Sequence, residues 1–404
     1  MKIIQGVNLN VMRMRKVKNI SVVGVGQMGK GIAQVCLMAG YDVTITDVQA
    51  TILEHAVSYI VNGLNKLEEK GQLQEGVPAL TILAKLNTTT NLADAVANAD
   101  YIIEAIVEKL DIKQKVCKEA LDNAPARCIF ASNTSSIRIT DIAKTCRNPA
   151  NVIGMHFFNP APLMRLIEII AGERSSMEAM DIGVKVGESL PCLRGERYVP
   201  RVLKDRPGFI VNRVLAPGRI YSDYIYDLAY KQGIPWDQID ADISNPEAPM
   251  STLVLADFVG RDVSLDTAEY YAETLSPDFA PGEFVRKQVA EGNLGKKTGR
   301  GFYDWSKGRP TPNLSKKAGI VNPMVFTAIQ ANEGCRVLEE GVCQSWKVID
   351  EAILAGMNFS GPMKAATTNY KHMAELLEEY AEKLQKPYLK PVGLLKSGKF
   401  IEMV

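Results

Sequence analysis

One histidine and one glutamate, twelve positions apart, have the side chains needed to move a proton. His156 is one of three histidines and lies in an apolar run that predicts a strand over residues 152–158. Glu168 interrupts the apolar run at residues 166–170, and a buried carboxylate needs a partner such as imidazole. We therefore predict that Glu168 orients His156 as a general base near neutral pH. The alternative is a core histidine capping a turn and a glutamate on an edge strand.

A glycine-rich stretch within residues 20–47 indicates a second kind of chemistry. Gly24, Gly26 and Gly29 have G-x-G-x-x-G spacing between a β-branched run and an amphipathic segment. The first glycine permits a tight turn, the second lets the backbone approach a pyrophosphate, and the third lets the helix pack on the strand. The helix N-terminus then faces the phosphate. The stretch predicts a dinucleotide-binding strand, turn, helix and strand, although such glycines also occur in ordinary loops.

Asp47 ends the second strand of this stretch and indicates which dinucleotide binds. A carboxylate at this position accepts both hydroxyls of the adenosine ribose, and no arginine follows to bind a 2′-phosphate. We therefore expect NAD rather than NADP. The alternative is that Asp47 caps the next helix, by accepting a hydrogen bond from Gln49 or from the first residues of that helix.

Composition limits the classes of partner. The chain has 404 residues, which predicts two or three domains, and a net charge of +1 gives no argument for nucleic acid or a membrane surface. No stretch after the first eighteen residues reaches the ~20 consecutive apolar residues of a membrane span. Seven scattered cysteines suggest neither a disulfide framework nor a zinc site and fit a reducing, cytoplasmic location.

The elements that must position these residues alternate along the first half of the chain. Helical patterns occupy residues 50–70 and 112–123, and short apolar strands occupy 101–106, 128–133 and 152–158. Such alternation predicts an α/β fold with a parallel, doubly wound, Rossmann-type sheet, whose ligands gather at the strand C-termini.

Beyond Pro207 and Gly208 the pattern changes to long helices, beginning with one over residues 209–232. The last ninety residues resemble a diverged repeat of this helical region. The matching strings are Trp236 to Asp240 with Trp346 to Asp350, Pro249-Met250 with Pro362-Met363, and Glu291 to Leu294 with Ser397 to Phe400. We predict an N-terminal extension over residues 1–18, a Rossmann domain over 19–206, a helical domain over 207–308 and its degenerate second copy over 309–404.

Several motifs together resemble those of the 3-hydroxyacyl-CoA dehydrogenases, in order and near the same spacing, over residues 17–305. They are the glycine motif from Gly24 to Ala33, Glu104 to Glu108, Ser132 to Ser136 (Ser-Asn-Thr-Ser-Ser), His156 to Pro160 (His-Phe-Phe-Asn-Pro), Pro207 to Arg213, and Gly295 to Gly299. The Ser-Asn-Thr-Ser-Ser and His-Phe-Phe-Asn-Pro strings are specific to this family and its close relatives.

The resemblance implies a role for each matching residue. The catalytic set is His156, Glu168, Ser135 and Asn212. The set expected to bind NAD is Gly24, Gly26, Gln27, Met28, Gly29, Asp47, Glu108, Lys113 and Asn133. The acyl-CoA substrate would contact Ser135, Asn159, Asn212 and Lys70. The implied reaction is oxidation of a short (S)-3-hydroxyacyl-CoA, such as 3-hydroxybutyryl-CoA, in which His156 removes the hydroxyl proton while hydride passes to NAD. No metal is needed.

Three departures from the family pattern affect these expectations. Gly63 replaces a serine on the helix that contacts CoA. A longer stretch over residues 191–205 adds Arg194, Arg197 and Arg201, either as a surface ribbon or as a phosphate clamp. Ser251 and Thr252 replace Gly-Pro beside the acyl chain.

The repeat and the catalytic set leave further alternatives open. Family members with one helical domain pair through it, so residues 315–404 could act as a built-in partner without a site of their own. The chain would then be a monomer with an internal pseudo-dimer, and otherwise a homodimer. Two other functions remain possible: oxidation of a free 3-hydroxy acid or sugar acid, and a structural or NAD-sensing role without turnover.

Overall fold

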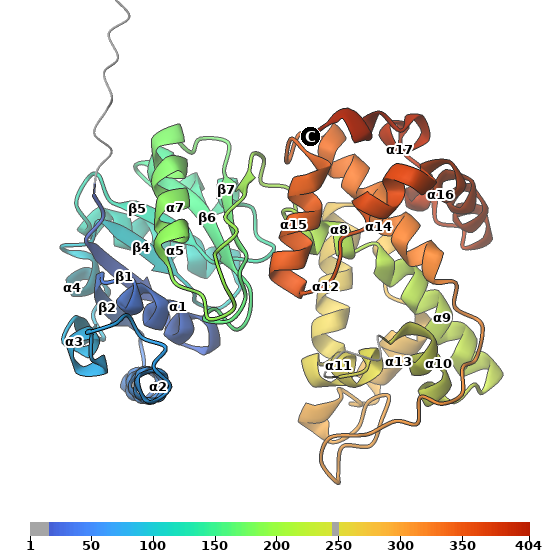
Figure 1. The fold of residues 1–404 in the computed structure, drawn as a ribbon, viewed down its shortest axis with the longest axis horizontal. Helices are drawn as coiled ribbons and strands as arrows, with labels where there is room; N and C mark the ends of the chain where they lie inside the picture. Colours follow the sequence, from blue (N-terminus) through green and yellow to red (C-terminus); the bar gives the residue numbers. More distant parts are fainter. Residues whose placement is uncertain (1–15, 245–249) are drawn as a thin grey trace, which may run out of the picture. The chain divides into compact units, whose positions relative to one another are not determined.

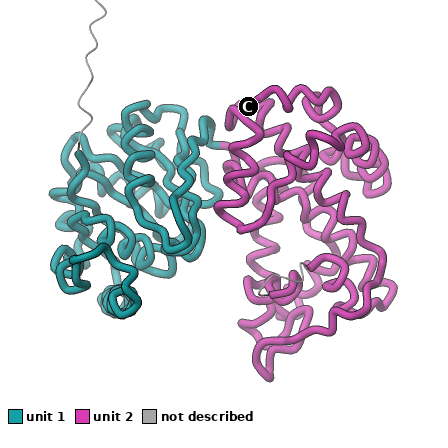
Figure 2. The backbone as a smooth tube through the Cα atoms, in the orientation of Figure 1, with its two compact units in different colours: residues 1–205 teal, residues 206–404 magenta. Residues whose placement is uncertain are grey.

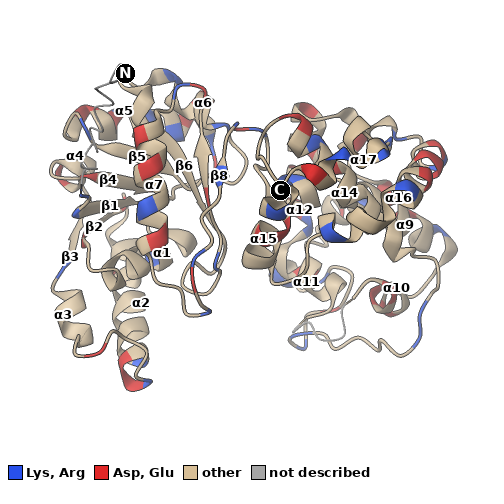
Figure 3. Cartoon of the chain, turned by 45° about the horizontal axis from the view of Figure 1, so that its top comes forward, with Lys and Arg blue, Asp and Glu red and all other residues tan. Residues whose placement is uncertain are grey.

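The computed structural model describes residues 16–244 and 250–404. The chain divides between Asp205 and Arg206 into two compact units, here called unit 1 and unit 2 (Figure 2). Positive and negative side chains are interspersed along both units (Figure 3), in keeping with a net charge of +1. Among the described residues no helix is long and apolar enough to cross a membrane.

Unit 1 contains one eight-stranded sheet of order β3-β2-β1-β4-β5-β6-β7-β8 (Figure 1). The strands are β1 (Asn19–Val23), β2 (Asp42–Thr46), β3 (Leu86–Thr89), β4 (Tyr101–Glu104), β5 (Ile129–Ser132), β6 (Val152–Phe157), β7 (Ile167–Ala171) and β8 (Arg201–Val202). The order reverses between β1 and β4, which is the switch point where ligands of doubly wound sheets bind.

The prediction of an entirely parallel sheet is wrong at one pair of strands. Strands β6 and β7 pair antiparallel, whereas the other neighbours pair in parallel. Residues 158–166 join β6 directly to β7 and form no crossover helix. A short connection of this kind permits only antiparallel pairing, because parallel strands need a crossover of a dozen or more residues.

Helices cover both faces of the sheet, as the alternating pattern predicts. They are α1 (Gln27–Met38), α2 (Ala50–Glu69), α3 (Ala79–Leu83), α4 (Leu92–Val96), α5 (Leu110–Asn123), α6 (Ile139–Ile142) and α7 (Met177–Ser189), with short 3₁₀ turns η1 (Ala143–Thr145) and η2 (Pro149–Asn151). One core joins α1, α2 and α7 to the side chains on one face of the strands. The predicted α/β, Rossmann-type fold is confirmed.

Unit 2 is helical. Its helices are α8 (Val211–Leu215), α9 (Gly218–Gln232), α10 (Trp236–Ile243), α11 (Thr252–Val259), α12 (Arg261–Thr274), α13 (Glu283–Ala290), α14 (Pro323–Glu339), α15 (Trp346–Met357), α16 (Met363–Lys383) and α17 (Gly393–Ser397), with 3₁₀ turns η3 (Pro277–Phe279), η4 (Lys296–Thr298), η5 (Pro387–Leu389) and η6 (Lys399–Glu402). The single helix predicted over residues 209–232 is wrong. It is broken between α8 and α9 at Pro217, which has no N–H to continue the helical ladder.

Two stretches of unit 2, the first helical segment (residues 209–305) and the second helical segment (residues 315–404), share a local pattern. Helices α10 and α15 both begin at a tryptophan, and the aspartate four residues on accepts the N–H of a residue thirteen positions later. The bonds join Asp240 to Leu253 and Asp350 to Met363. In this register Met363 corresponds to Leu253, so the predicted match of Met250 with Met363 requires a small gap in the alignment of the two segments and stays a prediction. Pro249, the other half of that match, lies outside the described residues.

Candidate active site

The predicted pairing of His156 with Glu168 is confirmed. The two residues face each other across the antiparallel pair β6 and β7, and His156 Nδ1 lies 2.7 Å from Glu168 Oε2. Glu168 is fully buried and His156 is 5% exposed. The ring of Phe158 lies 4.6 Å from the imidazole, centroid to centroid, so the pair sits in a largely apolar setting. Because Nδ1 faces the carboxylate, proton exchange with a substrate falls to Nε2.

The glycine-rich loop between β1 and α1 has the form that a dinucleotide requires. Gly24 adopts a left-handed φ of 83°, and a Cβ on Gly29 would lie 1.9 Å from the Gly24 carbonyl oxygen. A Cβ on Gly26 would instead meet nothing within 4 Å, so the backbone there is open to a ligand. Helix α1 has no side-chain cap on its first N–H groups, which leaves its N-terminus able to bind phosphate.

Asp47 lies beside this loop. Its Oδ2 accepts the Val25 N–H at 3.1 Å, and its Oδ1 accepts the Gln49 N–H at 3.3 Å. The second bond resembles the capping alternative, and the first attaches the carboxylate to the glycine loop. A carboxylate accepts several hydrogen bonds at once, so these contacts are compatible with ribose binding, which stays a prediction.

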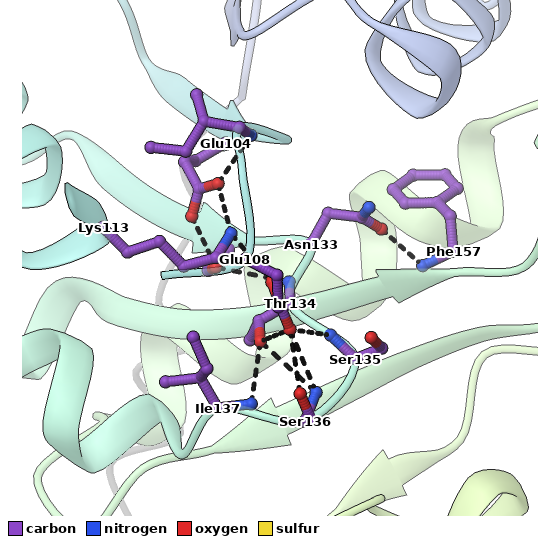
Figure 4. Close-up of polar contacts among 11 residues, drawn as sticks. Glu104, Glu108, Lys113, Asn133, Thr134, Ser135, Ser136, Ile137 and Phe157 are labelled. Atoms are coloured by element: carbon purple, nitrogen blue, oxygen red, sulfur yellow. Dashed lines mark hydrogen bonds and ion pairs between the residues drawn. The ribbon is translucent and has the colours of Figure 1, made fainter. Parts of the chain in front are cut away.

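A buried polar network, which sequence reasoning missed, connects the ends of β4 and β5 (Figure 4). Glu104 accepts hydrogen bonds from Lys113 Nζ at 2.6 Å, from Ser132 Oγ at 2.6 Å and from the Ile106 N–H at 2.8 Å. Lys113 is 1% exposed, and its ammonium also pairs with Glu108 at 3.2 Å. The signal was present, because Glu104 interrupts an apolar strand just as Glu168 does. Lys113, predicted to contact NAD, has its ammonium group buried between these two carboxylates.

Glu108 organises the loop that follows β5. Its Oε1 accepts the Thr134 hydroxyl at 2.6 Å and the N–H groups of Ser135 and Ser136 at 3.0 and 3.2 Å (Figure 4). Burial opposes ionisation of Glu108, but the Lys113 charge and these donors outweigh it and hold the pKa of Glu108 below its ordinary value. An ionised Glu108 thus fixes the backbone that carries Ser135.

Two predicted ligands on this loop keep polar atoms available. Asn133 uses its Oδ1 to accept the Phe157 N–H at 2.8 Å, which connects the ends of β5 and β6. Its Nδ2 and the Ser135 hydroxyl make no hydrogen bond with any residue that the structure describes. The Ser135 hydroxyl points away from Glu108 (Figure 4). Asn159 is exposed in the turn after β6.

Asn212, the remaining member of the catalytic set, lies on α8 of unit 2. Its side-chain amide makes no hydrogen bond within the described parts of the chain, and its neighbour Arg213 is buried. The turn before α8 is tightly constrained, because buried Phe209 adopts a left-handed φ of 56° that bulky residues rarely adopt. Unit 1 therefore brings together the other predicted residues of the chemistry, and unit 2 carries this one.

Helices α1 and α2 carry further predicted ligands. Gln27 and Met28, expected to bind NAD, begin α1, and Lys70, expected on the CoA side, is exposed at the end of α2. Gly63 faces buried Gln34, and a Cβ at position 63 would lie 2.8 Å from the Gln34 side-chain oxygen. Gln34 therefore occupies the space that a serine at position 63 would need.

The longer stretch over residues 191–205 is held on unit 1 by its own arginines. Arg197 donates to the carbonyl oxygens of Leu190, Ala161, Met164 and Pro191. Arg201 pairs with Asp181, and Arg194 is exposed. Since the Arg197 guanidinium is used on four backbone carbonyls, the surface ribbon is favoured over the phosphate clamp at this position.

Comparison with known proteins identifies the family. Residues 19–191 match the NAD-binding domain of 3-hydroxyacyl-CoA dehydrogenases, and residues 208–305 match the C-terminal domain of the same enzymes. A probable 3-hydroxybutyryl-CoA dehydrogenase of Deinococcus radiodurans is 39% identical over 286 residues, 70% of this chain and 99% of the relative. The chain belongs to the 3-hydroxyacyl-CoA dehydrogenase family. The matched NAD-binding domain and the open glycine loop assign NAD as the cofactor.

Two longer relatives extend the similarity past residue 305. The fatty acid oxidation complex subunit alpha of Psychrobacter arcticus is 31% identical over 407 residues, which cover 93% of this chain and 54% of that protein. A crystal structure of 3-hydroxybutyryl-CoA dehydrogenase from Escherichia coli K12 has a TM-score of 0.82 at 25% identity. The match covers 96% of this chain and 99% of that one.

Proposed function

We propose that this chain oxidises a short (S)-3-hydroxyacyl-CoA to the 3-oxoacyl-CoA with NAD, and catalyses the reverse reaction. The single observation that carries this proposal is the buried His156–Glu168 pair at 2.7 Å, on the same unit as an open glycine loop. Relatives named as 3-hydroxybutyryl-CoA dehydrogenases support the short acyl chain.

In the proposed mechanism, Glu168 accepts the Nδ1–H of His156 and stabilises the imidazolium that forms when Nε2 removes the substrate's hydroxyl proton. The glycine loop at Gly24 and Gly26 would hold NAD, which would supply the acceptor for the hydride that leaves C3 of the substrate. The Ser135 hydroxyl and the Asn212 amide donate to the reacting oxygen, and in the reverse direction they polarise the carbonyl. Glu108 keeps Ser135 in position through its backbone N–H.

The test measures NADH oxidation with acetoacetyl-CoA and with free acetoacetate, both at saturating NADH. Turnover with the thioester alone supports the proposal. Equal rates with both substrates would instead indicate a dehydrogenase of free hydroxy acids. His156→Ala should bind NADH as the wild type does and lose turnover by several orders of magnitude, because the general base is absent. Unchanged turnover in this variant would exclude the mechanism.

We also propose that the second helical segment is a degenerate copy of the first and acts as a built-in dimer partner, so that the chain is a monomer in solution. The shared Trp–Asp pattern supports the repeat. Ring contacts between the segments support the pairing, since Tyr221 packs edge-on against Phe326 and Tyr380. Light scattering after gel filtration tests it, and a dimer joined through residues 209–300 would contradict it.

Seven free thiols support our proposal of a cytoplasmic location.

A further inference from the structure

A small cavity in unit 2 is lined by residues that the proposed reaction does not use. Its volume is about 270 Å³, and its lining residues come from α9, α11, α12 and α13. All of its lining residues belong to the first helical segment. Two of them, Arg219 on α9 and Arg261 on α12, make no ion pair with any described residue.

Arg261 is the more unusual of the two. It is 4% exposed, and its guanidinium lies 4.8 Å from the centre of the Phe302 ring. Its Nε is buried without a hydrogen-bond partner, and no hydrogen bond from the rest of its guanidinium is found within the described residues. A buried cation without a partner is costly, so proteins normally pair it. The five N–H donors of a guanidinium match a carboxylate or a phosphate.

Arg219 supplies a second cation to the same cavity. It donates one N–H to the Ser264 carbonyl oxygen on α12, and its Nε is buried without a partner among the described residues. Burial lowers the pKa of Arg261 below its ordinary value and the nearby Arg219 charge acts in the same direction, although Tyr226 and the carboxylates of Asp257 and Asp223 partly oppose them. Two guanidinium groups that repel each other gain most from an anion placed between them.

The carboxylates nearby leave this positive charge incompletely balanced. Asp223 lines the cavity, and one of its oxygens accepts the Gly282 N–H at 3.0 Å. Asp257 accepts three hydrogen bonds, from the N–H groups of Phe302 and Tyr303 and from the Trp305 indole. The charged residues that line the cavity are two arginines and one aspartate, so its lining carries one net positive charge.

The remaining lining residues divide into two kinds: Ser222, Tyr226, Thr252 and Ser264 carry hydroxyl groups, and Leu255, Ala256, Val259 and Val285 are apolar. Leu255 and Val259 are about half exposed at its edge, and Val285 is buried. Apolar walls beside a cationic end suit a ligand with an anionic head and a short aliphatic chain. Phosphate has no aliphatic part to contact these apolar side chains, which is why we favour a carboxylate with a carbon chain.

We propose that this cavity binds a carboxylate carried on a short aliphatic chain, held between Arg219 and Arg261. The carboxylate could belong to a free short-chain acid or to the far end of an acyl chain that is attached to CoA. The second source rests on the proposed function. The shared chemistry is recognition of one carboxylate by two guanidinium groups.

The first experiment is calorimetric titration of the full-length protein with butyrate, glutarate, butyramide and inorganic phosphate. We expect the two carboxylates to bind and the neutral butyramide not to bind. Arg261→Leu should weaken carboxylate binding at least about tenfold, because a hydrogen bond to a charged group is lost. Arg286→Leu is the matched control, since Arg286 is exposed, pairs with Glu269 and does not line the cavity. It should leave binding unchanged.

The second experiment compares kcat/KM for acetoacetyl-CoA with that for a six-carbon 3-oxoacyl-CoA ending in a carboxylate. If the ligand is the acyl terminus, Arg261→Leu lowers kcat/KM for the carboxylated substrate about tenfold or more and leaves acetoacetyl-CoA turnover unchanged. If the ligand is a free acid, Arg261→Leu weakens carboxylate binding in the titration and leaves kcat/KM for both substrates unchanged. Arg219→Gln, which keeps a donor for the Ser264 carbonyl, is the second variant should Arg261→Leu fail to fold, and it should show the same selective loss.

Two results would overturn this proposal. One is the absence of both carboxylate binding and any selective effect of the arginine variants. The other is phosphate binding as tight as carboxylate binding. Either result is separable from failure of the proposed function, because acetoacetyl-CoA turnover is measured independently in the wild type.

Discussion

The two helical segments of unit 2 share a framework and differ in what their polar side chains do. Asp240 in the first segment is fully buried and accepts the Leu253 N–H together with the hydroxyls of Ser244, Ser251 and Tyr303. Asp350 in the second segment is only partly buried and accepts two backbone N–H groups, from Met363 and Lys364. The bond that the aspartate accepts from a backbone N–H lies at the start of a helix in both segments. In the first segment, the additional bond from Tyr303 also attaches Asp240 to the loop near residue 303.

Two asparagines make the same contrast more sharply. The Asn212 amide has no hydrogen-bond partner among the described residues, whereas the Asn332 amide contacts the carbonyls of Leu389 and Lys390 and accepts the Val392 N–H. The first segment thus keeps an amide available for a ligand, and the second uses its amide for packing. This difference is what we expect if the second segment has the supporting role that we propose for it.

The largest expected effect comes from breaking the ionic contact between the segments. Arg213 is 2% exposed and pairs with fully buried Glu333. Glu333→Ala should destabilise unit 2 by about 3–5 kcal/mol, because it leaves a buried guanidinium poorly compensated. Urea unfolding followed by tryptophan fluorescence measures this, since all three tryptophans lie in unit 2.

Glu340 provides the matched control for that variant. It also contacts Arg213, at 2.8 Å, but its side chain is 29% exposed. Glu340→Ala should cost no more than about 1 kcal/mol, as partly solvated pairs do. Equal losses in the two variants would contradict the view that burial at Glu333 makes the contact between segments strong.

The asparagines should separate activity from stability. Asn212→Ala should lower kcat by about 10²–10³-fold, as loss of a donor to a reacting oxygen does, and leave unfolding within about 0.5 kcal/mol of the wild type. Asn332→Ala should do the reverse and cost about 1–3 kcal/mol, because it leaves buried backbone groups without partners. Steady-state kinetics and urea unfolding of both variants decide between these outcomes. A stability loss in Asn212→Ala without a kinetic one would reverse the assignment of roles.

Sequence reasoning succeeded where a single side chain conflicts with its local pattern. Glu168 conflicts with an apolar strand, and His156 lies twelve residues earlier in the preceding predicted strand. Adjacent strands with a short connection bring such residues together, so the contact was predictable. The same argument applied to Glu104 would have predicted a buried partner but not its identity, because a lysine such as Lys113 is ordinary in an amphipathic helix.

Features that depend on packing between distant helices were not predictable. Arg219 and Arg261 lie forty-two residues apart and meet only because α9 and α12 line the same cavity. Gln34 fills the space above Gly63 for the same kind of reason. The hydrogen bonds that the two segments share, from Leu253 to Asp240 and from Met363 to Asp350, likewise depend on packing between helices that the dipeptide matches do not reveal.

The two aspartates test whether the additional bonds of the first segment matter. Asp240→Ala should cost about 2–4 kcal/mol, because several buried donors lose their acceptor at once. Asp350→Ala should cost about 1 kcal/mol, the usual loss when the acceptor at a helix N-terminus is removed. Thermal and urea unfolding of both variants measures the two losses of unfolding free energy, which can then be compared. Equal costs would show that the shared helix-starting bond dominates in both segments.

The smallest effect lies at the ends of two comparable helices. Helix α9 ends at Gly233 with a left-handed φ of 66°, and α15 ends at Asn358 with a φ of 61°. Glycine takes this conformation without strain, whereas asparagine takes it at a modest cost. Asn358→Gly should therefore stabilise the second segment by a few tenths of a kcal/mol, and Gly233→Ala should destabilise the first by about 1 kcal/mol. Opposite signs in urea unfolding support a common cap geometry, and a loss of stability in Asn358→Gly would show that the asparagine side chain contributes more than its backbone conformation costs.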